Sequence, residues 1–368
     1  MICESCGAES HGISASIGIC RDCIESKFDK HKDRLAGIHT SVRRDFGLQE
    51  SAPKKNGGSC GKCVRECAPD ISMTGYCGAR RLGVSGMISA SGPRNAAFAT
   101  CSSAALDSIS CTSARFTCNR GKPAFFLGKG GSQKPSGNRI SVSYASCNFN
   151  CLFCREWSFR ERAVIENLVT PQEIAEMIDD RTFCLSFTGG DPATQSDHAL
   201  ETARLALDKK SDLKICWETN GSENFEVLRE MISISGKTGG GIKFDIKAFS
   251  PKIHFALCGV SNGRTIANFR ALAEASKKPG APAVVASTTL VPGYVTPGEV
   301  WRIAELISSR SPRIPYLLFP FSPHFYLNDL PRTSEKHATA ALEASIDAGV
   351  ENVRIHNKED LGDFEYMP

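Results

Sequence analysis

The chain has 368 residues, and 44 Lys and Arg against 40 Asp and Glu give a formal net charge of +4. This charge is small for the length and argues against nucleic-acid binding. No apolar run approaches the ~18–20 residues that span a bilayer, and the N-terminus lacks the regions of a secretory signal. We therefore expect a cytoplasmic protein with no nucleic-acid and no membrane partner. Seventeen cysteines at short spacings indicate metal ligands rather than disulfides in such a compartment.

The first 25 residues carry two Cys-x2-Cys pairs, Cys3 with Cys6 and Cys20 with Cys23. Two such pairs at this separation are typical of a zinc ribbon, in which four thiolates close a tetrahedral site. No ligand position remains open in a closed site, so we expect a structural zinc or iron ion. Residues 26–58 are expected to form an amphipathic helix and a linker, and the apolar stripe of the helix begins at Ile24 and ends at Phe46. The stripe is predicted to pack on the main domain; the alternative is a partner-binding helix.

Residues 59–137 form a second cysteine-rich region with little helical or strand periodicity. The candidate metal ligands in this region are Cys60, Cys63, Cys67, Cys77, Cys111 and Cys118. More thiols are present than one tetrahedral site needs, and the sequence leaves the metal and its ligands open. Metal binding is expected to supply folding energy that a thin core does not. The glycine-rich stretch 128–137 is predicted to be a loop before the next domain.

From residue 138 onward, apolar runs alternate with helical patterns. We expect strands near 140–144, 183–187, 213–218, 242–246, 284–290 and 316–319, and helices near 171–180, 195–209, 222–233, 262–276, 297–309 and 333–348. Strands that alternate with helices predict parallel strands and right-handed crossovers. The fold class is therefore α/β, with a partial (β/α)6 TIM-like barrel over 138–368. Functional residues should lie at the C-terminal ends of its strands.

Polar motifs follow each of these predicted strands. The loop after the first strand carries Cys147, Cys151 and Cys154, which offer three thiolates to one soft metal centre. A [4Fe–4S] cluster normally takes four ligands, so three predict a cluster with one open iron. The later strand ends carry Gly189, Gly190 and Asp191, then Glu218 and Asn220, then Asp245 and Lys247, and then Val291 and Gly293. Asp245 and Lys247 are also explained by a salt bridge within the barrel. His324 and Tyr326, after the sixth strand, are candidates to contact substrate or a second cofactor, or else belong to a loop that closes the barrel mouth.

With these motifs, the chain over about 140–355 resembles the radical S-adenosylmethionine (SAM) superfamily. The resemblance implies that the open iron binds the amino and carboxylate groups of SAM and that cleavage of SAM yields a 5′-deoxyadenosyl radical. It further implies that the Gly189–Asp191 segment binds the amino group of SAM. Glu218 and Asn220 are placed at its ribose and carboxylate, and Phe153, Val291 and Gly293 near its adenine. Asp245 and Lys247 then face SAM or the substrate.

Within that superfamily, the Thr-Asn-Gly, Asp-Ile-Lys and Val-Pro-Gly segments resemble the activating enzymes of pyruvate formate-lyase. The N-terminal cysteines and the Cys-Asn-Phe-Asn-Cys-Leu-Phe-Cys loop resemble an archaeal branch. That branch is similar to the methyltransferase that installs a Cα-methyl group on a glutamine of methyl-coenzyme M reductase. The resemblance implies this protein as substrate, cobalamin as methyl carrier, and ferredoxin or flavodoxin as electron donor. The chain lacks the Asp-x-His-x-x-Gly cobalamin motif. The alternatives are an activating enzyme that leaves a glycyl radical on a partner, and a non-enzymatic, metal-stabilised binding module.

Overall fold

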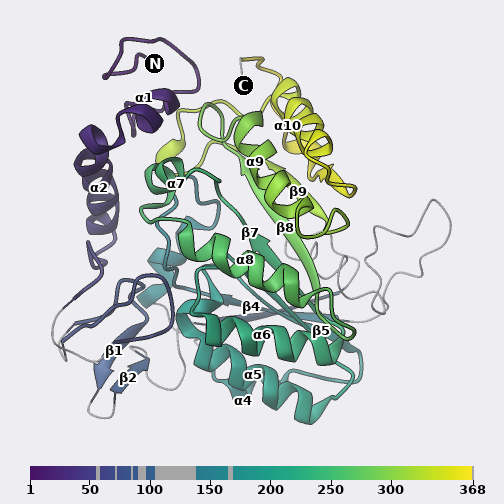
Figure 1. Cartoon of the computed structure of the whole chain (residues 1–368). Helices are drawn as coiled ribbons and strands as arrows, with labels where there is room; N and C mark the ends of the chain where they lie inside the picture. Colours follow the sequence, from purple (N-terminus) through teal and green to yellow (C-terminus); the bar gives the residue numbers. More distant parts are fainter. Residues whose placement is uncertain are drawn as a thin grey trace.

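A computed structural model describes residues 1–54, 59–70, 73–83, 86–89, 97–103, 138–164 and 169–366 (Figure 1). Cys111, Cys118 and the predicted loop 128–137 lie outside these residues. None of the described helices is long and apolar enough to cross a membrane.

One large sheet organises the chain from residue 97 onward. Its strand order is β10-β9-β8-β7-β6-β5-β4-β3, and all neighbours are parallel except β3 and β4. The strands are β3 (Ala97–Ser103), β4 (Asn138–Tyr144), β5 (Thr182–Thr188), β6 (Lys214–Thr219), β7 (Gly241–Asp245), β8 (Ala283–Leu290), β9 (Tyr316–Pro320) and β10 (Val353–Ile355). A separate antiparallel pair joins β1 (Arg80–Gly83) to β2 (Gly86–Ser89). The expected α/β class, with parallel strands joined by helices, is confirmed.

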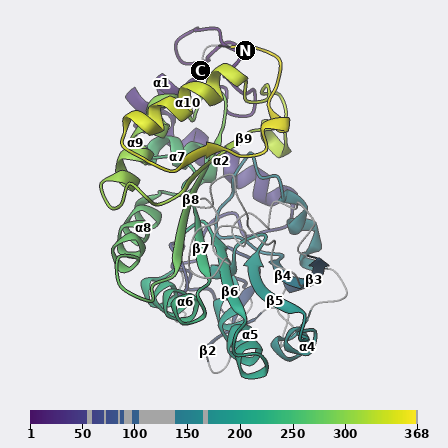
Figure 2. The same cartoon turned by 90° about the vertical axis from the view of Figure 1, so that its right-hand side faces the viewer.

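Helices connect these strands and lie outside the sheet, as Figure 2 shows for α5, α6 and α8. The helices are α4 (Pro171–Glu176), α5 (Ser196–Lys209), α6 (Phe225–Thr238), α7 (Pro251–Cys258), α8 (Gly263–Ala275), α9 (Pro297–Ser308) and α10 (Glu335–Asp347). Side chains between the two layers form the core, where Phe187 of β5 stacks on Trp217 of β6 with ring centroids 4.4 Å apart. Because neighbouring parallel strands are in register, their C-terminal ends meet at one edge of the sheet.

The sheet has seven parallel strands rather than the six that were predicted. A seventh strand, β10, pairs with β9, and β3 adds an antiparallel edge beside β4. Strand β10 has only three residues, all half-buried, so it lacks the apolar run by which the others were found. Helix α7 was also missed because its eight residues are too short to show a helical period. The six predicted strands and the six predicted barrel helices are all present.

The N-terminal segment packs on the sheet domain through two helices rather than the single predicted helix. Helix α1 (Arg21–Ser26) is separated from α2 (Phe28–Asp45) by Lys27, whose backbone leaves the helical conformation. Both helices contact α7 (Figure 1). Ile24, Leu35 and Val42 are buried in the same core as the barrel side chains, which confirms that the apolar stripe packs on the main domain.

His39 of α2 is the buried polar residue of this contact. Its Nε2 lies 3.1 Å from the carbonyl oxygens of Phe255 and Ala256 in α7. Burial lowers the pKa of His39 to about 4. The same cause lowers the pKa values of two further buried histidines, His254 and His337, to about 4.

These histidines predict a loss of stability in mild acid. Their neutral forms contribute stability that is fully present above about pH 6.5 and is lost as the pH falls toward about 4, because only the unfolded chain binds the protons. In that window the free energy of unfolding should fall by about 1.4 kcal/mol per histidine for each pH unit. Urea unfolding between pH 7.5 and pH 5 measures it.

His39→Gln is the matched variant, because glutamine does not titrate. It should be less stable at pH 7.5 and should lose less further stability on acidification than the wild type. An equal pH dependence in both proteins would contradict the assignment of a buried neutral His39.

Candidate functional site

A cavity of about 650 Å³ opens at the C-terminal ends of strands β4 to β9. This volume lies within the range of small-molecule sites. The predicted site residues that line it are Cys147, Cys151, Phe153, Cys154, Gly189, Gly190, Asp191, Glu218, Asn220, Asp245 and Lys247. Segments separated by up to a hundred residues therefore meet at one place, as the strand-end rule predicts.

The cysteine loop after β4 is held from behind by α7. The backbone N–H groups of Asn150 and Leu152 donate to the carbonyl oxygens of Cys258 and Leu257, each over 2.9 Å. Phe149 and Leu152 are buried in the core, so the loop is anchored by apolar contacts as well. This anchoring directs the three thiols into the cavity.

Burial controls the protonation of these thiols. It raises the pKa of Cys154 to about 11 and holds the pKa of Cys147 well above its ordinary value. Cys151 differs because a hydrogen bond with the Cys258 thiol, 3.5 Å away, lowers its pKa. Three thiols that face one cavity fit a cationic, thiophilic centre, since a metal replaces the protons and stabilises the thiolates.

The Gly189-Gly190-Asp191 segment passes directly beside the cysteine loop. Gly190 has a φ of 53°, and a Cβ there would lie 2.3 Å from the carbonyl oxygens of Tyr144 and Ser146. Only glycine fits this close approach. Asp191 accepts hydrogen bonds from the backbone N–H groups of Ala193 at 2.9 Å and Asn220 at 2.7 Å, and burial raises its pKa to about 6. Its carboxyl group thereby ties the end of β5 to the end of β6.

Two lysines and two carboxylates form a charged network on the next strands. Lys243 Nζ lies 3.0 Å from Glu218 Oε2 and 3.6 Å from Asp245 Oδ1, and Lys247 Nζ lies 3.1 Å from Asp245 Oδ2. Burial opposes the charge on Asp245, but the two lysines hold its pKa well below its ordinary value. The Ser287 hydroxyl also donates to Asp245. The predicted salt bridge within the barrel is present, and its members line the cavity.

Sequence reasoning missed several residues of the cavity wall, among them Lys243, Ser287 and Arg160. Lys243, Asp245 and Lys247 alternate along β7 and the loop that follows, so the period of two was a usable signal for Lys243. Arg160 had no such signal, because it lies in the 3-10 segment Trp157–Val164. It is 4% exposed, and its guanidinium lies 4.5 Å from the Phe325 ring centroid.

Four predicted residues, Val291, Gly293, His324 and Tyr326, are not among the residues that line the cavity. Val291 is buried in the core, and Gly293 packs so closely on Gly12 that a Cβ would lie 2.0 Å from the Gly12 carbonyl oxygen. The Tyr326 hydroxyl donates to Asp45 at the end of α2. His324 precedes the short 3-10 turn Phe325–Leu327. The Val-Pro-Gly segment thus contacts the N-terminal region rather than the cavity.

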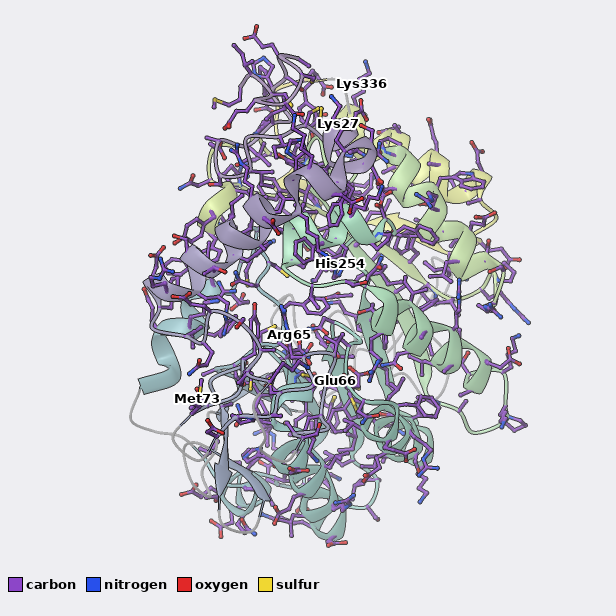
Figure 3. All side chains as sticks on the ribbon, turned by 60° about the vertical axis from the view of Figure 1, so that its left-hand side comes forward. Lys27, Arg65, Glu66, Met73, His254 and Lys336 are labelled. Carbon is purple, nitrogen blue, oxygen red and sulfur yellow. The ribbon has the colours of Figure 1, made fainter. Side chains whose placement is uncertain are left out.

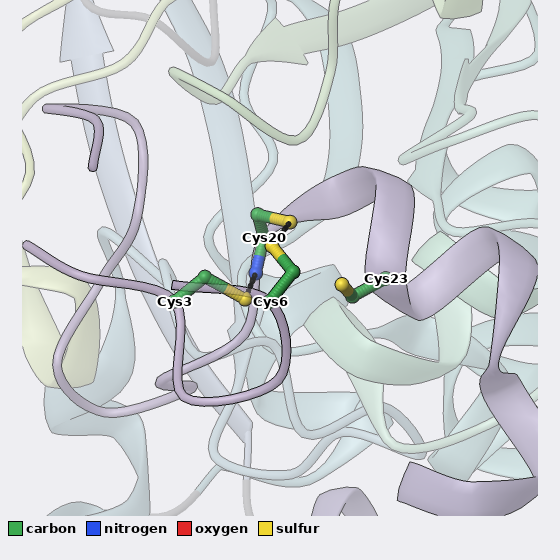
Figure 4. A group of neighbouring side chains, drawn as sticks. All are labelled: Cys3, Cys6, Cys20 and Cys23. Carbon is green, nitrogen blue, oxygen red and sulfur yellow. Dashed lines mark hydrogen bonds between the residues drawn. The ribbon is translucent and has the colours of Figure 1, made fainter. Parts of the chain in front are cut away.

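The N-terminal cysteines come together as predicted for a ribbon. The sulfurs of Cys3, Cys6, Cys20 and Cys23 all lie within 4.8 Å of one another (Figure 4). Cys6 Sγ and Cys20 Sγ are 3.8 Å apart, the separation expected around one tetrahedral ion with metal–sulfur bonds of ~2.3 Å (about 3.8 Å). Burial opposes ionisation of the Cys3 thiol, but hydrogen bonds from backbone N–H groups outweigh it and lower the pKa of Cys3 to about 6. The four side chains are therefore suited to hold one zinc or iron ion.

Comparison with known proteins shows what the central part of the chain is similar to. Residues 141–307 match the radical SAM superfamily. The isethionate sulfite-lyase activating enzyme of Desulfovibrio desulfuricans is 30% identical over 138 residues, which are 37% of this chain and 41% of that enzyme. The chain thus spans about two fifths of this curated relative.

Two solved structures are similar to part of this chain. A domain of the pyruvate-formate lyase-activating enzyme of Bacteroides vulgatus has a TM-score of 0.39 and 18% identity, and the match covers 47% of this chain and 98% of that one. Streptococcus suis SuiB bound to the precursor peptide SuiA has a TM-score of 0.44 and 14% identity, and the match covers 57% and 46% of the two chains.

The ribbon predicts that Cys23→Ser removes close to one equivalent of bound metal. A lost thiolate opens the tetrahedral site, and structural metal sites contribute directly to folding. Total zinc and iron by mass spectrometry, together with the melting temperature, measure the effect. Cys184→Ser is the matched control, because Cys184 is equally buried but lies in β5. Equal metal content in Cys23→Ser and the wild type would contradict a metal site here.

Proposed function

We propose that this protein reductively cleaves SAM at a [4Fe–4S] cluster held by Cys147, Cys151 and Cys154, and uses the resulting radical to modify a protein or peptide. The observation that supports the proposal best is the cavity itself. It joins three thiols to the Gly-Gly-Asp segment and to the charged network on β6 and β7. When bound, the cluster and SAM supply a 5′-deoxyadenosyl radical, which abstracts hydrogen from unactivated carbon.

Different side chains around the thiols are proposed to contact different parts of SAM. Asp191 and the two glycines before it offer an acceptor and a close backbone approach for the amino group of SAM. Asn220 is fixed by its Nδ2 donating to Asn148 Oδ1 over 2.7 Å, so its position is set by the cysteine loop. Glu218 and Lys243 carry the polar contacts of the next strands. Phe153 and Phe319 line the cavity with apolar surface and exclude water from a reactive radical.

The network of Glu218, Lys243, Asp245 and Lys247 balances two negative against two positive charges. A balanced set costs less to bury than a single charge and keeps each carboxylate oriented. We infer that it orients the polar groups of SAM or of the substrate without placing a net charge beside the cluster.

The modified molecule is proposed to be a protein. The resemblance of the N-terminal cysteines and the cysteine loop supports Cα-methylation of a glutamine in methyl-coenzyme M reductase, with cobalamin as methyl carrier. The described residues around the cavity offer thiols for a cluster and polar groups for SAM, and they show no feature specific to a corrinoid. No step is therefore assigned to cobalamin.

A second candidate is the activation of a glycyl-radical enzyme. The 30% identity to the isethionate sulfite-lyase activating enzyme favours this reaction. The position of the cysteine-rich segments, which precede the cysteine loop, counts against this candidate.

Anaerobic assays separate the two candidates. The reconstituted protein receives SAM, a reductant and a candidate partner, with and without cobalamin. A cobalamin-dependent methyl gain on the partner together with S-adenosylhomocysteine supports methylation. A glycyl radical detected by electron paramagnetic resonance, with 5′-deoxyadenosine as the only nucleoside, supports activation.

Cysteine variants test the central chemistry. Cys147→Ala, Cys151→Ala or Cys154→Ala should abolish 5′-deoxyadenosine formation, because two thiolates do not hold the cluster. The fold should remain, since alanine keeps an apolar side chain at each position and large side chains such as Phe187 and Trp217 form most of the core. Cys184→Ala removes a buried thiol outside the cavity and should retain the activity of the wild type. Turnover of SAM at the wild-type rate in Cys154→Ala would refute the proposal.

Asp191→Asn should weaken SAM binding by roughly tenfold or more. An amide accepts with only one of its two groups, so either Ala193 or Asn220 loses its backbone hydrogen bond and the strand ends separate. Equilibrium dialysis with labelled SAM on the reconstituted protein measures the affinity, and iron content should stay unchanged. Asp212→Asn, at an exposed carboxylate, is the control. Equal SAM affinity in Asp191→Asn and the wild type would contradict the assigned role.

A further inference from the structure

Arg160 is a buried cation of the cavity wall that lacks a counter-ion. It is 4% exposed, and its Nη1 is buried without a hydrogen-bond partner among the residues that the structure describes. Removing a guanidinium from water without giving its N–H groups an acceptor is unfavourable. An anion that enters the cavity supplies the missing acceptor, so the position of Arg160 indicates a place for a negatively charged group of a ligand.

The other cations that line the cavity already have carboxylate partners. Lys243 and Lys247 belong to the charged network on β6 and β7. Arg155 Nη1 lies 3.2 Å from Asp360 Oδ2. Within the part of the cavity wall that the structure describes, Arg160 is therefore the cation that forms no ion pair.

Aromatic rings hold the guanidinium of Arg160 in place. Its central carbon lies 4.5 Å from the ring centroid of Phe325, 5.1 Å from that of Phe159 and 5.8 Å from that of Phe46. The faces of aromatic rings attract a guanidinium, but they do not accept its hydrogen bonds as a carboxylate does. The rings thus fix the cation and leave its donors for a ligand.

The ring nearest to the guanidinium is held by an unusual backbone. Phe325 has a φ of 55°, a conformation that bulky residues rarely adopt and that is kept only where the surroundings impose it. Its ring stacks on that of Trp157, with centroids 5.6 Å apart and planes at 16°. The next two backbone N–H groups, those of Tyr326 and Leu327, both donate to the carbonyl oxygen of Leu152, at 3.0 and 3.2 Å. The loop after β9 is thereby fixed to the cysteine loop.

Arg160 lies in a different part of the cavity from the groups assigned to SAM. It follows the cysteine loop after β4, and its nearest ring, Phe325, follows β9. Asp191 and Asn220 follow β5 and β6, which lie between β4 and β9 in the sheet. Arg160 therefore connects the first and the last of the strands that surround the cavity. This position leaves its donors for the second ligand of the proposed reaction, the substrate.

Half-buried aromatic rings continue outward from the guanidinium. Phe46, Trp157 and Phe325 are each half-buried, and their ring centroids lie 5.6 to 6.2 Å apart. Phe46 is brought here by α2, which packs on α7; Figure 3 labels Lys27 directly before α2 and His254 within α7. These rings offer apolar surface to a chain that approaches the cavity beside its unpaired cation.

We propose that Arg160 binds a carboxylate of the protein or peptide substrate, an aspartate or glutamate close to the modified residue. A guanidinium presents two parallel N–H donors that match the two oxygens of a carboxylate. The half-buried rings contact the apolar part of the same segment. The inference rests on the proposed modification of a protein or peptide and specifies an acidic segment as the one that binds.

Peptide binding tests the site without any turnover of SAM. Two acetylated, amidated pentapeptides carry a single glutamate or a single glutamine among alanines. Equilibrium dialysis against the reconstituted protein, with SAM present and no reductant, measures the affinity of each peptide. The glutamate peptide should bind roughly tenfold more tightly or better, because hydrogen bonds to a charged acceptor are stronger than those to a neutral amide. Equal affinities in the wild type would overturn the proposal.

Variants assign the preference to one side chain. Arg160→Gln should remove the preference for the glutamate peptide. Arg160→Lys should keep part of it, because an ammonium retains the charge but not the two parallel donors. Arg155→Gln is the matched control, since Arg155 lines the same cavity but is already paired with Asp360, and it should keep the wild-type preference. A full preference in Arg160→Gln would contradict the assignment to Arg160.

SAM is the other source of a carboxylate in this cavity. Dialysis of labelled SAM without peptide separates the two sources, because a loss of SAM affinity in Arg160→Gln with an unchanged peptide preference would place the anion on SAM and overturn the proposal. The proposed function is judged separately. A wild type that prefers the glutamate peptide but does not cleave SAM would refute SAM cleavage and leave the carboxylate site standing.

Discussion

Two backbone hydrogen bonds between the cysteine loop and the end of α7 are the constraint on which the site depends. A loop with three cysteines has few internal hydrogen bonds of its own, and without external anchors its thiols would not keep a common direction. Asn150 and Leu152 donate to carbonyl groups at the end of α7, and the side chains of Phe149 and Leu152 are buried. The helix that anchors the loop is in turn covered by α1 and α2. The direction of the three thiols therefore rests on packing between segments far apart in sequence.

The cavity combines groups whose ionisation is opposed by burial with groups whose ionisation is supported by neighbours. Cys147 and Cys154 have raised pKa values and need a metal to become thiolates. Asp245 remains ionised because Lys243 and Lys247 lie beside it. Asp191, whose pKa is about 6, lies between these two cases and is held by backbone N–H groups rather than by a cation. One wall of the cavity thus carries the thiols of Cys147 and Cys154, whose ionisation burial opposes. The other wall carries lysines and carboxylates that balance one another's charge.

Much of the fold and of the cavity could be predicted from the sequence, and the failures have physical causes. Long buried strands leave apolar runs, and the alternation of strands and helices fixes their parallel order, so the cysteine loop, Asp191 and Lys247 could be placed at one edge. Strand β10 and helix α7 were missed because elements of three and eight residues leave no periodic pattern. Gly293 looked like a ligand-binding glycine, yet its missing side chain makes room for Gly12. Local sequence does not reveal which distant backbone a glycine accommodates.

The contact of His39 with the cysteine loop has a consequence for how the chain can be divided. Asn150 Nδ2 lies 3.1 Å from His39 Nδ1 and donates to the His39 carbonyl oxygen over 3.2 Å. The N-terminal helices therefore supply part of the interior of the sheet domain. A fragment that begins at residue 138 would expose α7 to water and leave Asn150 without these partners. We therefore expect the smallest fragment that folds with an ordered cysteine loop to include α2, which lies well before the first residue of the matched segment 141–307.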